Sequence, residues 1–282
     1  MIVSDKYLVQ GIETITWFDL ADNVCEFIFD DLQEAEMSVE SETIYAEGKN
    51  GTRIGATDRN KTSTFTATNG TVVDGALAVQ VGSEVEKGVQ TINNYMDIIT
   101  TANGTTAVTE FYPVGATGNE IAYIYKKNAD GSLGDKYPIA AQASATAFAY
   151  DPDTKTITLP TGAFAANDEL VAFYDTKAKV AKRVVNENNK FSKTGKAIFD
   201  CFVKDICNDK SYHAKITYYK AKMSGTFSLS FGSDFSTHNI EIEALSGGCA
   251  KGASTVLWDM VVYDEDEVIK TKTEFEELDE NP

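Results

Sequence analysis

Residues 61–70 read KTSTFTATNG, and threonine occupies every second position within this stretch. Side chains alternate between the two faces of a β-strand, so a strand here has one hydroxyl face and one face that contains Phe65 and Ala67. The hydroxyl face consists of Thr62, Thr64, Thr66 and Thr68. The stretch therefore predicts a strand that buries one face and leaves the other in contact with water.

The same alternation is repeated twice nearer the C-terminus. Around Phe227 and Leu229 the alternate positions are Ser224, Thr226, Ser228 and Ser230. Around Ile240 and Ile242 they are Asn239, Glu241 and Glu243. Three such segments are typical of an antiparallel sheet that packs on one side only. The alternation alone does not distinguish a functional polar surface from an ordinary solvated face.

Composition and charge limit the classes of function. The 282 residues carry a formal charge of -18 and have an estimated pI of 4.5. This charge argues against sequence-independent binding of nucleic acid, because phosphate contacts depend on Lys and Arg. The N-terminus lacks the basic and apolar parts of a signal peptide, and no apolar run approaches the ~18 residues of a membrane span. We therefore expect a globular protein that is made in a cytoplasm.

The sequence contains no complete catalytic motif. Gly195-Lys196 fails as a phosphate-binding loop, because Ala197 stands where Ser or Thr is required. His213 and His238 are the only histidines, and they match no nucleophile or zinc arrangement. We expect surface or strand-packing roles for both.

The acidic and sulfur-containing residues also favour structural roles. Glu241 and Glu243 have a spacing that a glycosidase could use, but no aromatic sugar cleft is discernible around them. The acidic run 264–267 lacks the glycine and alternating ligands of an EF-hand loop. No C-x-x-C pair occurs, and the four cysteines are predicted to be buried free thiols: Cys25, Cys201, Cys207 and Cys249. The sequence predicts a protein that is not an enzyme and has no cofactor or metal.

Turn signals organise the first third of the chain. Residues 12–29 predict a hairpin around Asp22-Asn23. The Gly-rich and basic segment 48–61 is predicted to be a long exposed loop. Residues 74–82 predict a short helix that begins near an aspartate and ends at a glycine.

The remainder of the chain has three parts. Asn103-Gly104 predicts a hairpin, and residues 106–180 read as a compact segment of short strands. Residues 193–208 place Ile198, Phe202 and Ile206 four positions apart, which predicts a helix packed on a sheet. The acidic run 264–282 is predicted to be a solvated or partly disordered tail.

Several blocks of the sequence together resemble the tail-tube (major tail) proteins of tailed bacteriophages. They are GKNGTRIGATDRNKTSTFTATN at 48–69, GALAVQVGSEVEKG at 75–88, and YYKAKMSGTFSLSFGSDFSTHNIEIEAL at 218–245 with LWDMVVYDED at 257–266. The resemblance implies a β-sandwich with a packed helix, which forms hexameric rings that stack into a β-lined channel for DNA. Residues 106–180 lie outside these blocks and look like an outward insertion.

The resemblance also assigns roles to residues. A DNA channel should present hydroxyls and carboxylates rather than Lys or Arg, because cations on its wall would hold phosphate. The lumen-facing candidates are Thr62, Thr64, Thr66, Thr68, Ser228, Ser230, Glu241 and Glu243. The candidates for a ring-stacking loop are Lys49, Arg53, Arg59 and Lys61. The expected partners are further copies of the chain and other tail proteins, including sheath and tape measure, with DNA as a transient passenger and no membrane.

These observations combine into one expectation. The fold is mainly β, an antiparallel β-sandwich or barrel-like sheet with one packed α-helix and an inserted small β segment. Residues 1–105 and 186–263 form the tail-tube-like domain, 106–185 the insertion, and 264–282 the acidic tail. The function is that of a structural virion protein assembled in the host bacterial cytoplasm. The alternatives are a head-decoration or other capsid-associated protein, and a ligand-binding bacterial β-sandwich module.

Overall fold

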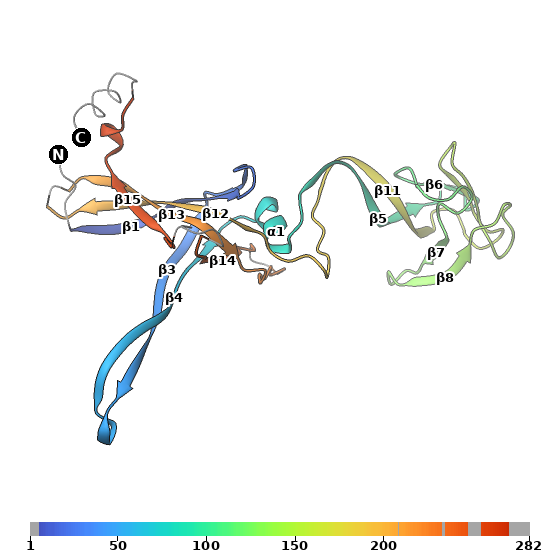
Figure 1. Cartoon of the computed structure of the whole chain (residues 1–282). Coiled ribbons are helices and arrows are strands. Elements are labelled where there is room, and N and C mark those ends of the chain that lie inside the picture. Colours follow the sequence, from blue (N-terminus) through green and yellow to red (C-terminus); the bar gives the residue numbers. More distant parts are fainter. Residues whose placement is uncertain (1–5, 208, 233–234, 248–254, 271–282) are drawn as a thin grey trace. The chain divides into compact units, whose positions relative to one another are not determined.

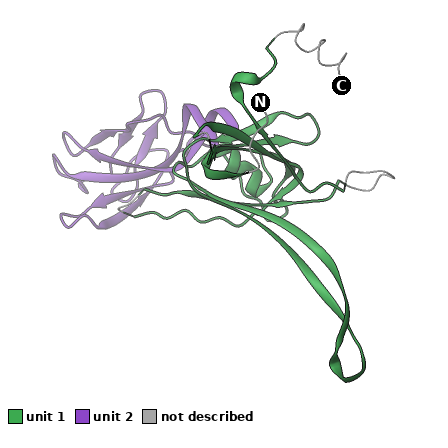
Figure 2. Ribbon diagram, turned by 90° about the vertical axis from the view of Figure 1, so that its left-hand side faces the viewer, with its two compact units in different colours: residues 1–85, 184–282 green, residues 86–183 purple. Residues whose placement is uncertain are grey.

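The computed structural model describes residues 6–207, 209–232, 235–247 and 255–270. The chain divides into unit 1, which contains residues 1–85 and 184–282, and unit 2, which contains Glu86–Arg183 (Figure 2). The protein is mainly β and its sheets are antiparallel, as the sequence predicts. No helix in the described ranges is long and apolar enough to cross a membrane.

Unit 1 is built on one sheet of eight strands in the order β2-β1-β12-β13-β14-β4-β3, and β15 also pairs with β13 (Figure 1). The strands are β1 (Tyr7–Asp19), β2 (Cys25–Phe29), β3 (Leu32–Glu47), β4 (Arg53–Asn69), β12 (Thr194–Asp205), β13 (Ser211–Met223), β14 (His238–Ala244) and β15 (Asp259–Tyr263). The predicted turn at Asp22-Asn23 joins β1 to β2, and Asn23 adopts a positive φ of 56°.

The sheet of unit 1 curves until distant strands pack on each other. Phe65 on β4 and Phe199 on β12 stack with ring centroids 3.8 Å apart, although two strands lie between β4 and β12 in the sheet order. Tyr218 on β13 contacts Phe199 edge-on and shares a buried hydrogen bond of 2.7 Å with Ser63. The inward side chains of this one curved sheet therefore form the core, and the sheet does not close into a barrel.

The predicted short helix is present as α1 (Asp74–Val81). Gly82 ends it with a φ of 71°, a left-handed conformation that glycine adopts without steric cost. Ala76 and Val79 bury their side chains in the core of unit 1. The α-helix packed on this sheet is thus α1, and it comes from the first half of the chain.

The helix predicted for 193–208 is wrong, because Thr194–Asp205 forms strand β12. A spacing of four is a multiple of two, so Ile198 and Phe202 share one face of a strand as readily as one face of a helix. The opposite face is the buried one and contains Phe199 and Val203. Both faces of this segment carry apolar residues, and the helical reading took account of only one of them.

Gly195 allows β12 to pack closely against β1. A Cβ atom built on Gly195 would lie 2.4–2.5 Å from indole atoms of Trp17, which is completely buried. Gly195→Ala is therefore expected to lower the free energy of unfolding by about 1–3 kcal/mol, because the indole must shift within a packed core. Urea unfolding measures this change, and Gly11→Ala, where a Cβ meets nothing within 4 Å, is the control. Equal stability of both variants would contradict the packing argument.

The strand predicted around 224–230 is also wrong. Ser224–Ser230 lies outside every strand, although its residues alternate between polar and apolar. Strand β13 ends at Met223 after pairing with Ile242–Ala244 of β14, and the backbone amide of Ser224 still donates to the carbonyl oxygen of Glu241. The side-chain amide of Gln80 on α1 donates to the next carbonyl oxygen along this edge, that of Asn239, so α1 takes the place that a longer strand would need.

The predicted long loop 48–61 is mostly strand. β3 and β4 pair along nearly their whole length, and only the turn around Lys49–Gly51 separates them. The distal part of this hairpin, residues 40–61, projects from the sheet of unit 1 and is called the arm below (Figure 1). Both faces of the arm are exposed because it packs on no core, so the alternation that identifies a half-buried strand is missing.

Unit 2 contains a four-stranded sheet, β5-β11-β7-β8, and a three-stranded sheet, β6-β10-β9, which share one core. The strands are β5 (Glu86–Thr100), β6 (Thr106–Val108), β7 (Tyr123–Lys127), β8 (Leu133–Pro138), β9 (Ala149–Asp151), β10 (Thr156–Thr158) and β11 (Glu169–Arg183). Gly104 turns the chain, but β5 and β6 belong to different sheets, so the predicted hairpin at Asn103-Gly104 does not form. Strand β5, which the sequence assigned to residues 1–105, lies in unit 2.

The cysteines and the acidic tail are the remaining features that the sequence analysis addressed. Cys201 is buried, but Cys25 and Cys207 are exposed free thiols, so burial of all the cysteines is wrong; Cys249 lies outside the described residues. Of the acidic tail 264–282, residues 264–270 are described, and a short 3-10 helix, η2 (Glu265–Glu267), follows Asp264, which pairs with Lys210. Residues 271–282 lie outside the described part of the chain.

Candidate functional site

The threonine strand predicted from 61–70 is confirmed as the sheet-bound half of β4. Phe65 and Ala67 are buried in the core, and the threonines at alternate positions are half-buried or exposed on the opposite face. On β14, Ile240 and Ile242 are buried and the alternate positions are exposed. Sequence alternation was reliable for both strands because each lies in the sheet and has one face on the core.

Pairing of three strands brings carboxylates to both sides of the threonines. In register, Thr66 lies between Glu241 on β14 and Glu36 on β3. Two residues further along β4, Thr68 lies between Asn239 on β14 and Glu34 on β3. We call the whole set the glutamate-threonine face. Its members are Glu34, Glu36, Ser38, Glu40, Thr62, Thr64, Thr66, Thr68, Asn239, Glu241 and Glu243.

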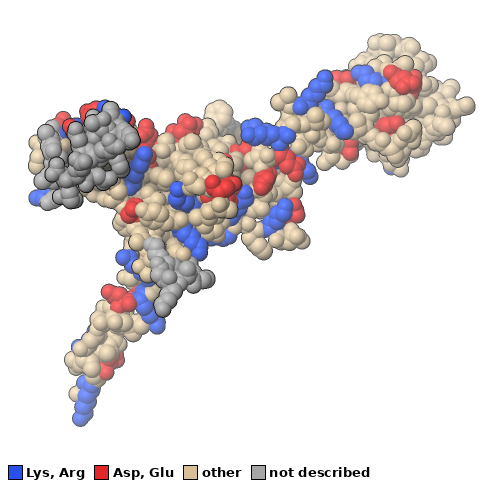
Figure 3. All heavy atoms as spheres, turned by 45° about the horizontal axis from the view of Figure 1, so that its top comes forward, with Lys and Arg blue, Asp and Glu red and all other residues tan. Residues whose placement is uncertain are grey.

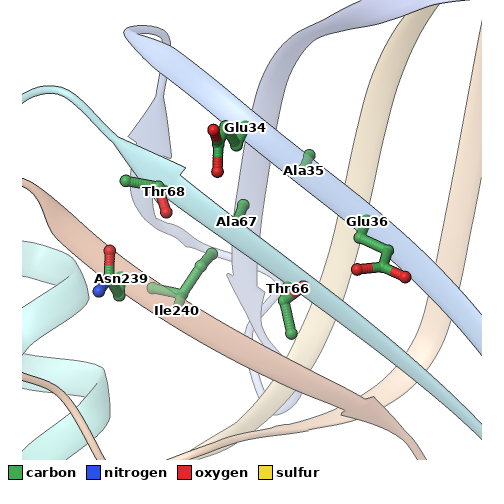
Figure 4. A pocket seen from close by; sticks show the side chains of 8 residues that line it. All are labelled: Glu34, Ala35, Glu36, Thr66, Ala67, Thr68, Asn239 and Ile240. Carbon is green, nitrogen blue, oxygen red and sulfur yellow. The ribbon is translucent and has the colours of Figure 1, made fainter.

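Part of this surface is hollowed. A hollow of about 490 Å³ is lined by residues of β3, β4 and β14, and Figure 4 shows these three strands side by side. The lining residues are Glu34, Ala35, Glu36, Thr66, Ala67, Thr68, Asn239 and Ile240. A shallow depression of this kind differs from the enclosed, mainly apolar clefts in which enzymes bind small substrates.

The face is strongly acidic. Five exposed glutamates contribute a formal charge of -5, and none of the residues of the face is Lys or Arg. The nearest in-register cation is Lys222 on β13, opposite Glu243, and its ammonium group donates to the carbonyl oxygen of Ser192. A polyanion that approaches this surface is repelled, because the carboxylates add their fields at short range.

The structure does not bring every predicted lumen residue to this surface. Ser228 and Ser230 lie in the irregular segment that follows β13 and belong to no strand. Conversely, Glu34, Glu36 and Glu40 were missed by the sequence analysis. Their spacing in QEAEMSVE at 33–40 follows the same period of two, which could have identified them.

The arm carries the four cations that were predicted for ring contacts. Arg59 makes a bidentate ion pair with Glu42 across the hairpin, at 2.9 and 3.0 Å. The hydrogen bonds from Arg59 and then from Asn60 hold the pKa of the Glu42 carboxyl below its usual range. Arg53 stacks over the ring of Tyr45 at 3.8 Å. These two arginines therefore brace the hairpin, whereas Lys49 lies at its turn.

The arm also exposes apolar side chains. Ile54 is 72% exposed, and Tyr45 and Ile44 are each more than one-third exposed. Figure 3 shows basic and acidic side chains distributed along the arm, with basic groups at its tip. These apolar groups and the unpaired outer edges of the two strands make the arm a candidate surface for contact with another protein.

The residues considered for catalysis have structural surroundings. Gly195-Lys196 lies within strand β12 and forms no phosphate-binding loop. His238 is completely buried. Its Nε2 lies 2.8 Å from the amide oxygen of Gln80, and its Nδ1 accepts a hydrogen bond of 3.3 Å from the backbone amide of Val73. Both bonds fit a neutral imidazole that anchors α1 to β14.

The buried His238 predicts an acid-sensitive fold. Burial holds the pKa of His238 below its usual value, so the unfolded chain takes up a proton more readily than the folded one. The contribution of neutral His238 to the free energy of unfolding is fully present above the unfolded-state pKa of about 6.5. It is lost as the pH falls toward the lower folded-state pKa. We expect wild type to lose more unfolding free energy between pH 7.5 and 5.5 than His238→Gln does. Urea unfolding at both pH values tests this, and equal losses would exclude His238 as the cause.

The sequence of this chain is similar to that of a known protein family. A family model described as the YomU/Tube protein family matches residues 8–258, which include most of both units. No curated protein matches the chain. The match covers far more than half of the sequence and agrees with the resemblance drawn from the sequence blocks. The chain therefore belongs to the YomU/Tube protein family and is a structural protein of the phage tail-tube type.

Proposed function

We propose that this protein assembles into homomeric rings that stack into the tail tube of a phage, and that the tube conducts DNA during ejection. The rings are hexameric in this proposal, as the resemblance to tail-tube proteins implies. The observation that carries it is the glutamate-threonine face, a continuous polar and acidic surface that spans three paired strands.

This surface suits the wall of a DNA channel. Each phosphate contact made by Lys or Arg releases counterions and strengthens binding, so a basic wall would retain the passing DNA. The glutamates of the face repel phosphate instead, and the threonine hydroxyls keep the wall wetted between them. In the proposed tube, the face lines the lumen while the opposite faces of the same strands remain in the core of unit 1.

The arm supplies contacts between subunits in this proposal. Its exposed Ile44, Tyr45 and Ile54 would be covered by a neighbouring copy, and Lys49 at the turn would meet that copy's carboxylates. The large acidic excess of the chain makes such carboxylates abundant. Arg53 and Arg59 would contribute mainly by keeping the arm extended, because both already interact within it.

The location and partners follow from assembly. The chain would be made in the cytoplasm of the host bacterium and incorporated into the virion. Sheath and tape-measure proteins would contact the outside and the inside of the tube, respectively. An enzymatic role is not part of the proposal.

Electron microscopy of the purified protein tests the proposal directly. Under conditions that favour polymerisation, we expect tubes of uniform diameter with a central channel. A density map should then place β3, β4 and β14 on the channel wall. Persistent monomers, or tubes with the glutamate-threonine face on the outside, would contradict the proposal.

A further inference from the structure

A second cluster of ionisable groups lies on the unit 1 sheet, on the side opposite the core. It is on β1, β12 and β13, whereas the glutamate-threonine face is on β3, β4 and β14. Glu13 on β1, Asp200 on β12 and His213 on β13 bring one ligand atom each to within 4.8 Å of one another. Asp200 and His213 are only 18% and 19% exposed, respectively. Glu13 is far from Asp200 and His213 in sequence, and the pairing of β1, β12 and β13 brings the three residues together.

A β-bulge lies beside this cluster, at Glu13. The register of β1 against β12 shifts between Ile12 and Thr14, so Glu13 is an extra residue in the ladder. Ile12 pairs with Cys201 and packs on the core, and Thr14 pairs with Asp200 on the outer face. Alternation from Ile12 places Glu13 on the face of Asp200, and the extra residue keeps Thr14 on that face as well, so Glu13 and Thr14 are both beside Asp200. Bulges commonly redirect a side chain in this way beside functional sites.

The geometry around His213 matches that of a metal ligand. Its Nδ1 lies 3.3 Å from Oδ1 of Asp200. Two ligands that are each about 2.0–2.1 Å from a tetrahedral zinc ion are separated by about 3.3 Å. Its Nε2 lies 3.2 Å from Oε2 of Glu265. Metal-bound histidines usually donate the second ring N–H to a carboxylate, which fixes the tautomer that leaves the other nitrogen free to bind the ion.

The surroundings hold the imidazole in place and favour a cation. The ring lies between Phe202 at 4.7 Å and Tyr263 at 5.6 Å, measured between centroids. Lys215 lies 3.4 Å from Oδ2 of Asp200 and so contacts the oxygen opposite the one that faces His213. The carboxylates of Glu13, Asp200 and Glu265 outnumber the single ammonium group of Lys215. The site therefore keeps a net negative charge when His213 is neutral.

We propose that Glu13, Asp200 and His213 form a binding site for a divalent transition-metal ion such as Zn²⁺, with Glu265 orienting the imidazole. A nitrogen ligand among carboxylates favours zinc over Mg²⁺ or Ca²⁺, which take oxygen ligands. The bound ion would join β1, β12 and β13 and fasten the segment around Glu265 to the sheet. This proposal is independent of tube formation and concerns a different surface.

Zinc titration of the chelator-treated, tag-free protein at pH 7.5 tests the site. Calorimetry is expected to show one zinc ion per chain, and zinc should raise the melting temperature, because an ion that binds only the folded state stabilises it. His213→Gln and Glu13→Gln should each weaken binding at least about tenfold, and Glu265→Gln should weaken it by about 10- to 100-fold. Binding should also weaken as the solution is made more acidic, because protons compete with the ion for its ligands.

Matched variants keep the test decisive. Glu241→Gln removes an exposed carboxylate elsewhere and His238→Gln removes the other histidine, so both should bind zinc as wild type does. The metal-free stability of His213→Gln, measured by urea unfolding, separates a lost ligand from a lost fold. Co²⁺ should give a visible absorption band in wild type that His213→Gln lacks. Absence of saturable zinc uptake by wild type, or equal affinity in folded His213→Gln, would overturn the proposal and leave the cluster as an ion-pair network.

Discussion

Phage particles that carry Glu241→Lys and Glu243→Lys in this protein are expected to eject their DNA more slowly than wild type. The two substitutions change the formal charge of the glutamate-threonine face by +4 per subunit, and in a hexameric ring they place twelve ammonium groups on the wall. Each contact between lysine and phosphate releases counterions, so DNA is retained at low salt and passes more freely at high salt. Time-resolved fluorescence of ejected DNA at several salt concentrations measures the effect.

The comparison with other variants identifies the cause. Glu84→Lys with Asp135→Lys changes the total charge equally at exposed positions outside the face, and ejection should then stay near the wild-type rate. Glu34→Lys with Glu36→Lys, on the neighbouring strand, should slow ejection as Glu241→Lys with Glu243→Lys does. All six substituted sites are exposed, so each variant should change the free energy of unfolding by only about 0.5 kcal/mol. Equal ejection rates in every variant, or a failure of the Glu241 and Glu243 variant to form tubes, would show that the face is not the channel wall.

Shortening the arm is expected to abolish tube formation while the subunit still folds. The ladder pairs Glu42 with Arg59, so residues 43–58 can be replaced by Asn-Gly, the sequence most compatible with a two-residue hairpin turn. The removed segment contains Ile44, Tyr45, Lys49 and Ile54, none of which lies in the core of unit 1. Circular dichroism and urea unfolding should therefore resemble wild type, whereas electron microscopy should show no tubes.

Two milder variants separate the forces that act through the arm. Ile54→Ser with Ile44→Ser removes apolar area and keeps the charges, and its effect should not depend on salt. Lys49→Gln removes the cation at the turn, and any loss of assembly should be largest in low salt, where ion pairs contribute most. Arg59→Glu breaks the pair with Glu42 and should loosen the arm itself. Normal tubes from the shortened chain would exclude the arm as an assembly element.

Sequence reasoning succeeded where one face of a segment meets the core. The alternation in β4 and β14 predicted both the buried residues and the Thr and Glu residues on the opposite face. In these strands, burial of a side chain depends only on the face to which it points. The same reasoning found α1 and its terminal glycine, whose left-handed conformation depends only on local backbone sterics. The tail-tube resemblance rested on these same strands, and the family match agrees with it.

Errors arose where the outcome depended on neighbours. Ile198 and Phe202 fit a helix and a strand equally well, and only the packing of β12 between β1 and β13 decides between them. The alternation of 224–230 predicted a strand, but the Gln80 side chain on α1 binds the edge of β14 along which that strand would have to continue. The arm gave no strand signal, because two strands that pair only with each other need no apolar face.

The sequence by itself determined the β class, the two-faced strands and the acidic character of the chain, since these follow from side-chain chemistry at single positions. Only the tertiary structure decided which polar faces meet. Pairing of β3, β4 and β14 joins Glu36, Thr66 and Glu241 into one surface, and pairing of β1, β12 and β13 joins Glu13, Asp200 and His213 into another. The physical reason is that strand order and register depend on contacts between distant segments, which a local pattern of residues does not encode.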